Sequence, residues 1–261
     1  MRELRPIQPL PPIRRDMDIV ANRLPQTAAL AGETIRLEYD GGGTLTLAFA
    51  AGRLRWSALF EQEPARSGDD ACDMVEIRPG IFFVDFAPAD ESMAFSHVLD
   101  RGGGRALTVR SDLVGSEAKP ELRERVIPAR IAGHAGAYVP IAETRELLGK
   151  RLFCEYSAEA ALEHIYVNST TIVWQWLRSP PQFAQEVGIE AVTMWKIQER
   201  LYLISTRAED PIQLTLLLDL QRMRNVGRLF GRGAFGVVDR RCGAKITLLG
   251  EFAYPNGYTP G

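Results

Sequence analysis

The residues best suited to chemistry gather in one segment, Leu162–Leu177, which reads LEHIYVNSTTIVWQWL. Its first part, Leu162–Val167, and its last part, Thr171–Leu177, are rich in the β-branched and aromatic residues that favour strands. The polar residues Asn168–Thr170 between them are typical of a turn. The segment therefore predicts two consecutive strands, each with side chains that alternate between two faces.

One face of these strands collects four side chains with useful chemistry. His164 and Tyr166 lie two apart on the first strand, and Trp174 and Trp176 lie two apart on the second. Histidine can exchange a proton near neutral pH, and indole rings can stack on a flat ligand. If both faces turn to one interior, they line a cavity suited to an apolar or aromatic molecule. The alternative is a barrel wall in which the same rings only pack.

Three further residues of the same half complete the candidate site. Tyr156 precedes the segment, whereas Trp195 and Glu199 follow it. Glu199 joins His164 and Tyr166 as a candidate for acid–base catalysis. Tyr156 and Trp195 join the two indoles of the segment as candidates for holding a ligand.

The remaining motifs do not favour metal or phosphate chemistry. His97 and His134 are too scattered relative to His164 to predict a metal triad, and His134 is expected at a surface or between two units. The glycine runs Gly102–Gly104 and Gly231–Gly236 lack both the GxxxxGK[ST] pattern and the βαβ context of nucleotide-binding loops. We therefore predict no metal site and no cofactor.

Composition restricts the class of protein. The 261 residues have a formal net charge of -2, with 46% hydrophobic and 25% charged residues, as in ordinary globular proteins. This balance argues against nucleic acid and anionic membranes as partners, and no apolar run reaches the ~18–20 residues of a membrane span. The dispersed cysteines Cys72, Cys154 and Cys242 and the lack of a secretory leader favour a cytoplasmic protein.

The elements that must position the candidate residues are strands. Thr34–Tyr39 and Thr44–Phe49 alternate between apolar and polar residues around the glycine turn Asp40–Gly43. About seven short strands at regular spacing before residue 112 are typical of an antiparallel meander or barrel. Residues 1–27 are rich in proline and predict an extended arm. The charged, proline-interrupted residues 115–146 predict a linker through which two units pack on each other.

The strand pattern of the first half recurs in the second half at an offset of 117–120 residues. Gly32–Tyr39 matches Gly149–Tyr156, and Arg55–Leu59 matches Val173–Leu177. Two later pairs of segments match in the same order. Each half therefore predicts an antiparallel barrel, because closure removes the exposed edges of so short a sheet.

These halves resemble the MoaF family, whose members carry two calycin (lipocalin-like) barrels in one chain. The resemblance rests on Gly32…Tyr39-Asp40, on Leu54-x-Trp56, on the run EHIYxNS at residues 163–169 and on Trp174-x-Trp176. It covers about residues 30–231 and implies an all-β fold of two tandem antiparallel barrels. The expected organisation is an arm at 1–27, a first barrel at 28–114, a linker at 115–146 and a second barrel with an extension at 147–261.

Each half is also distantly similar to phenolic acid decarboxylase, a single calycin barrel that uses two tyrosines, an arginine and a glutamate. The second half keeps Tyr156 and Glu199, but Cys154 stands at the place of the other tyrosine and Trp176 near that of the arginine. Without that arginine a substrate carboxylate lacks its bidentate partner. Decarboxylation of phenolic acids is therefore not expected.

Three functions are left open by the sequence. The first is binding of a small apolar or aromatic molecule in a barrel cavity, chiefly that of the second half. The second is a cofactor-free lyase or isomerase that acts on such a ligand by acid–base catalysis in the same barrel. The third is a structural role with both barrels filled by side chains. A homodimer is also left open.

Overall fold

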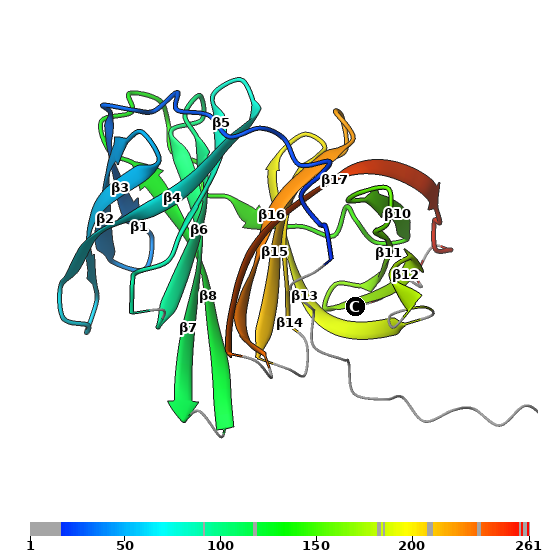
Figure 1. The fold of residues 1–261 in the computed structure, drawn as a ribbon. Coiled ribbons are helices and arrows are strands. Elements are labelled where there is room, and N and C mark those ends of the chain that lie inside the picture. Colours follow the sequence, from blue (N-terminus) through cyan, green and yellow to red (C-terminus); the bar gives the residue numbers. More distant parts are fainter. Residues whose placement is uncertain are drawn as a thin grey trace, which may run out of the picture.

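The computed structural model describes residues 17–90, 92–116, 119–181, 184, 186–207, 211–233, 236–255, 257 and 260. No α-helix occurs in this part of the chain. Two closed antiparallel β-barrels stand side by side, the first drawn in blue to green and the second in green through yellow to red (Figure 1). The prediction of an all-β fold with two tandem barrels is confirmed.

The first barrel contains eight strands, each paired with its neighbours in the sequence. Pairing of the first strand with the eighth closes it, the up-and-down connectivity of lipocalin-like barrels. The strands are β1 (Thr34–Tyr39), β2 (Gly43–Ala50), β3 (Arg53–Phe60), β4 (Arg66–Arg78), β5 (Ile81–Phe86), β6 (Met93–Asp100), β7 (Arg105–Ser116) and β8 (Lys119–Ile131).

The second barrel repeats this plan. A short strand, β9 (Ala142–Glu143), pairs with one edge of β13 and precedes the eight barrel strands. Pairing of β10 with β17 and of β12 with β13 completes the ring. The strands are β10 (Lys150–Glu155), β11 (Ala161–Asn168), β12 (Thr171–Arg178), β13 (Val187–Gln198), β14 (Leu201–Arg207), β15 (Ile212–Asp219), β16 (Arg224–Gly233) and β17 (Gly236–Glu251).

The segment expected as a linker differs most from the sequence-based prediction. Residues Lys119–Ile131 form β8, which pairs with β7 along its length and closes the first barrel on β1. The two prolines that suggested a break, Pro120 and Pro128, lie opposite Gly115 and Leu107 of β7. Only residues 129–131 of β8 also pair with β1. Both prolines precede these residues, so they pair with β7 alone and remove no hydrogen bond to β1.

The repeat also extends further than the sequence indicated. The hairpin of β16 and β17 closes the second barrel as β7 and β8 close the first, so residues beyond 231 belong to the barrel. The paired ends of β7 and β8 project below both barrels in Figure 1. Each half is thus a complete eight-stranded unit.

The two barrels pack directly on each other. An apolar cluster between them joins β4 to β7 of the first barrel with β13 to β16 of the second, and it includes Val75, Phe83, Val98, Leu203, Leu217 and Val226. From residues 115–146, Ile141 is a buried member of this cluster and Val126 packs against it. The expectation that the barrels pack through residues 115–146 is therefore corrected: strand faces of both barrels form most of the contact.

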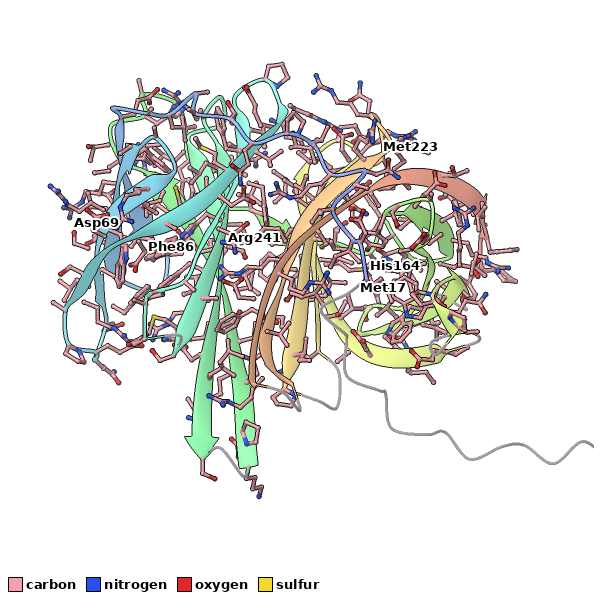
Figure 2. All side chains as sticks on the ribbon, in the orientation of Figure 1. Met17, Asp69, Phe86, His164, Met223 and Arg241 are labelled. Atoms are coloured by element: carbon pink, nitrogen blue, oxygen red, sulfur yellow. The ribbon has the colours of Figure 1, made fainter. Side chains whose placement is uncertain are left out.

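Buried charges cross the same junction. Asp85 is fully buried and lies 3.0 Å from the Arg241 guanidinium and 3.7 Å from that of Arg228. Burial raises the pKa of Asp85 from 3.8 to about 6, against the opposing effect of the two arginines. Arg241 stands between the barrels in Figure 2, close to the Asp85 carboxylate that it binds.

The first described residues form an arm that bridges both barrels. Met17 and Ile19 are buried in the core of the second barrel, and the Ile19 carbonyl accepts a hydrogen bond from the Gly243 amide at 3.0 Å. The arm then crosses to the first barrel, where Arg23 forms a buried ion pair with Asp73 (Figure 1). From residue 17 onward the predicted N-terminal arm therefore contacts both barrels, and residues 1–16 of the prediction lie outside the described residues.

Candidate functional site

The interior of the second barrel receives most of the predicted site residues. His164 and Tyr166 on β11 point inward with Leu162, and Trp174 and Trp176 on β12 pack against the same core. His164 lies directly opposite Trp174 in the β11–β12 ladder. Figure 2 places His164 within the second barrel, close in that view to Met17 of the arm.

His164 is a neutral group in this interior. Its side chain is 1% exposed, and its Nδ1 atom has no hydrogen-bond partner. Burial lowers the pKa of His164 from 6.5 to about 4, so the ring is uncharged at neutral pH. Its ring stands edge-on to that of Tyr166, with the centroids 6.3 Å apart.

The two predicted tyrosines are also buried. Tyr166 is fully buried, and its hydroxyl has no hydrogen-bond partner. Tyr156 is 3% exposed and belongs to the same core. Burial raises the pKa of both hydroxyls well above 10, so they act as neutral donors or acceptors.

A carboxylate that the sequence analysis missed completes this group. Glu190 on β13 accepts a hydrogen bond from the Trp174 indole Nε1 at 2.7 Å. Burial raises the pKa of Glu190, and the hydrogen bond from the uncharged Trp174 indole opposes the shift. Thr206 itself is 2% exposed, and its hydroxyl makes no hydrogen bond of normal geometry. Glu190 is therefore a half-buried acid whose carboxylate forms no ion pair with another described residue.

Two of the predicted residues do not join the barrel interior. The Glu199 side chain is 80% exposed, pairs with Lys196 at 3.1 Å and lines an open surface groove of about 520 Å³. Trp195 packs against the cluster between the barrels, on the opposite face of β13 from Met194. Glu199 follows β13 in the turn to β14, where an acidic side chain remains in solvent.

Both barrels contain the same arrangement of a tryptophan, a glycine and an acid, and in the second barrel that acid is Glu190. In the first barrel Trp56 donates from its indole to Asp70 at 2.7 Å, as Trp174 does to Glu190. The two tryptophans lie opposite Gly68 and Gly188 respectively, and each glycine leaves room for the indole. The pattern is a tryptophan on the third barrel strand and Gly-x-Asp or Gly-x-Glu on the fourth. The signal was present in the sequence, but only the strand register connects its parts.

The interior of the first barrel is packed differently. Phe60, Phe86, Phe95 and His97 form stacked pairs whose ring centroids lie 5.0–6.4 Å apart. The His97 Nδ1 atom bonds to the Thr108 hydroxyl at 2.9 Å, which in turn bonds to the Tyr39 hydroxyl at 3.1 Å. Aromatic rings and this short chain therefore fill the first barrel. Among the inward-facing residues that the structure describes there, the one buried polar atom without a partner is His97 Nε2.

The remaining predicted features lie away from both interiors. His134 is half-buried against Gly104 in the turn after β8, and its carbonyl accepts a hydrogen bond from Arg130. Cys154 and Cys242 are buried free thiols in the second barrel, and burial raises the pKa of both to about 12.

Across the described ranges, no cluster of three His, Cys, Asp or Glu side chains could hold a metal ion. No described helix is long and apolar enough to cross a membrane.

The fold defines a protein of two tandem, closed antiparallel β-barrels. The model of the MoaF N-terminal domain matches residues 18–115, and that of the MoaF C-terminal domain matches residues 141–252. The chain belongs to the MoaF family, and the resemblance of the sequence to that family is confirmed.

Other comparisons add little. No protein with a curated description matches the chain. A putative beta-lactamase from Burkholderia vietnamiensis, known from its crystal structure, is 14% identical, covers 41% of this chain and 100% of its own, and has a TM-score of 0.35. A likeness of that size carries no argument about this chain.

Proposed function

We propose that this protein binds a small molecule with an apolar or aromatic body in the interior of its second barrel. The observation that carries the proposal is a set of three buried polar atoms without partners in that interior: His164 Nδ1, the Tyr166 hydroxyl and the Thr206 hydroxyl. A buried polar group left unpaired costs about 1–3 kcal/mol, so native proteins satisfy such groups with water or ligand. An eight-stranded barrel has room for one small ligand.

The contrast between the two barrels supports the choice of the second. In the first barrel the Tyr39 hydroxyl and His97 Nδ1 are both paired through Thr108. In the second barrel the Tyr166 hydroxyl, His164 Nδ1 and the Thr206 hydroxyl are unpaired, against His97 Nε2 alone among the described inward-facing residues of the first. The indoles of Trp174 and Trp176 add flat apolar surface beside them.

The alternative function is acid–base catalysis on the bound ligand. Glu199 is exposed, so we assign the role of acid or base to Glu190, whose pKa is raised by burial. A carboxyl group of raised pKa keeps its proton to a higher pH than an ordinary glutamate and can donate it, and the neutral His164 can accept one. Binding is the function we favour, because it requires only the unpaired atoms and the apolar walls.

Matched tyrosine variants test the proposal. Tyr166→Phe removes an unpaired hydroxyl and should leave the melting temperature equal or higher, while weakening ligand binding about three- to tenfold. Tyr39→Phe removes a paired hydroxyl and should cost about 1 kcal/mol of stability without changing binding. Binding is measured by intrinsic tryptophan fluorescence with a panel of aromatic and alkyl alcohols and amines.

Two outcomes would overturn the proposal. One is that no member of the panel changes the fluorescence of the wild-type protein. The other is that Tyr166→Phe melts well below wild type and binds the panel equally well, which would make Tyr166 a wall residue.

A further inference from the structure

The two barrels share one Trp–Gly–acid arrangement but place it in different surroundings. In the first barrel Trp56 also packs near Phe86 and Phe95, with ring centroids 5.6 and 5.9 Å away. In the second barrel Trp174 lies opposite His164 across the ladder, and its acid Glu190 is on the same inward face as Val192 and Met194. The indole–carboxylate hydrogen bond therefore lies in a core of packed aromatic rings in the first barrel, whereas in the second barrel it lies next to unpaired polar atoms.

The charge of the second interior is the decisive property. His164 is neutral at physiological pH, and the hydroxyls of Tyr156 and Tyr166 are neutral as well. The hydrogen bond that the Glu190 carboxylate accepts comes from the Trp174 indole N–H, which is uncharged. Arg240 of β17 is bound to the Met17 carbonyl of the arm. An ionised Glu190 therefore places a negative charge beside the Trp174 indole.

A second acid lies at the same end of β13. Glu186 immediately precedes the strand, and its carbonyl accepts a hydrogen bond from the Trp176 amide at 3.0 Å. Burial raises the pKa of Glu186, so its carboxyl group too is partly withdrawn from solvent. The Glu190 carboxylate, hydrogen-bonded to the Trp174 indole, attracts a cation and repels an anion.

We propose that the ligand of the second barrel is a small organic cation, a protonated amine on an aromatic or apolar body, whose ammonium group pairs with Glu190 beside the Trp174 ring. This inference rests on the proposed binding function and specifies its ligand class. An ammonium group supplies the charge-assisted hydrogen bond that the buried carboxylate lacks. An indole face adds a cation–π contact. The His164, Tyr166 and Thr206 atoms then bind polar groups or water around the ligand body.

Three probes of the same shape and different charge test the ligand class. Benzylamine, benzyl alcohol and benzoate are titrated into the full chain by calorimetry at neutral pH. We expect benzylamine to bind at least about tenfold more tightly than benzyl alcohol, with benzoate weakest, because a hydrogen bond to a charged partner is worth more than a neutral one.

Matched variants locate the effect. Glu190→Gln keeps an oxygen that can accept from Trp174 and should reduce the preference for the amine to within about twofold, with benzyl alcohol binding unchanged. Asp70→Asn makes the same change in the first barrel and should leave all three affinities as in wild type. A measurement on wild type alone gives the same information: amine affinity should fall as the pH drops through the raised pKa of Glu190, and alcohol affinity should not.

The outcomes separate the two proposals. Equal binding of amine and alcohol, tighter binding of benzoate, or an amine preference that survives in Glu190→Gln would overturn the ligand class and leave the binding function standing. Failure of all three probes to bind the wild-type chain would overturn the binding function, and the ligand class with it.

Discussion

At the scale of single residues, Glu190 links the stability of the second barrel to its proposed function. Its carboxylate is half-buried beside Trp174 and is stabilised by the uncharged indole N–H of that residue. A charge kept in an apolar interior without a cation lowers the stability of the folded state. Such a residue is typical of a site in which the missing partner belongs to a ligand.

Glu190→Gln should therefore raise the melting temperature at neutral pH. The folded-state pKa of Glu190 lies above its ordinary value of 4.5, so the unfolded chain loses this proton first and stability falls as the pH rises from 4.5 through the raised pKa. Glutamine has no proton to lose and keeps the acceptor for Trp174. The gain should disappear below pH 4.5, which thermal melting at several pH values measures. A variant that melts lower than wild type at neutral pH would show that the charge stabilises the fold.

Gly188→Ala tests the close approach of Trp174 to β13. A Cβ atom at this position would overlap the six-membered part of the indole ring, which core packing holds in place. We expect the variant to lose about 1–3 kcal/mol of unfolding free energy in urea. Gly41→Ala is the control, because a Cβ there meets nothing within 4 Å and should change stability by less than about 0.5 kcal/mol. Equal stability of both variants would mean that the indole moves freely.

Strand alternation predicted most of the site at this scale. It placed His164, Tyr166, Trp174 and Trp176 on inward faces, where the structure has them. It failed for Glu199, because alternation does not say where a strand ends and its turn begins. Glu190 was missed because its role depends on the register between β12 and β13, which places Gly188 opposite Trp174.

At the scale of elements, the arm from Met17 onward binds both barrels. Its Asn22 amide donates to the Tyr156 carbonyl at 2.9 Å in the second barrel, and its Thr27 amide donates to the Met74 carbonyl at 2.9 Å in the first. Between these points Arg23 pairs with Asp73, and both side chains are less than 10% exposed. An ion pair so buried is costly to break from one side only.

Arg23→Ala should accordingly destabilise the protein by about 3 kcal/mol, since it leaves Asp73 buried with Arg241 4.0 Å away as its remaining partner. The control is Arg55→Ala, which removes an arginine that is 80% exposed and 3.9 Å from Asp69 and should cost less than about 1 kcal/mol. Urea unfolding measures both. Similar small losses would mean that the arm contributes nothing to the junction.

The element pattern could be predicted where local signals were strong. The matching strands at an offset of 117–120 residues indicated two similar barrels. The charged sequence of β8 looked like a linker because Arg123, Arg125 and Arg130 face solvent and its prolines occupy an edge with one partner. The long hairpin of β16 and β17 was recognised only in part, because its arginines contact acids of the first barrel that no local pattern reveals.

At the scale of the whole molecule, the barrels are joined by apolar contact and by buried charge. Asp85 faces Arg228 and Arg241, with Asp73, Asp239 and Arg23 completing the network. Because burial outweighs these attractions, the folded-state pKa of Asp85 is about 6 against an ordinary 3.8. The folded state therefore holds this proton more tightly than the unfolded state does.

This imbalance predicts a pH dependence of the junction. The contribution of Asp85 to stability falls as the pH rises from 3.8 to about 6 and recovers on acidification. Wild type should therefore gain on the order of 1–3 kcal/mol relative to Asp85→Asn between pH 7 and pH 4. Urea unfolding at both pH values measures the difference, and the exposed Asp69→Asn serves as control. A wild type that instead loses stability relative to Asp85→Asn on acidification would mean that the arginines lower this pKa.

The central claim, that the second barrel is a ligand site and the first is a packed core, is tested most directly by a high-resolution crystal structure of the protein purified without added ligand. We predict ordered density, from a bound molecule or from water, in contact with His164 Nδ1 and the hydroxyls of Tyr166 and Thr206, and none among the stacked rings of the first barrel. A second barrel filled by its own side chains, with those three atoms bonded to protein groups, would contradict the account.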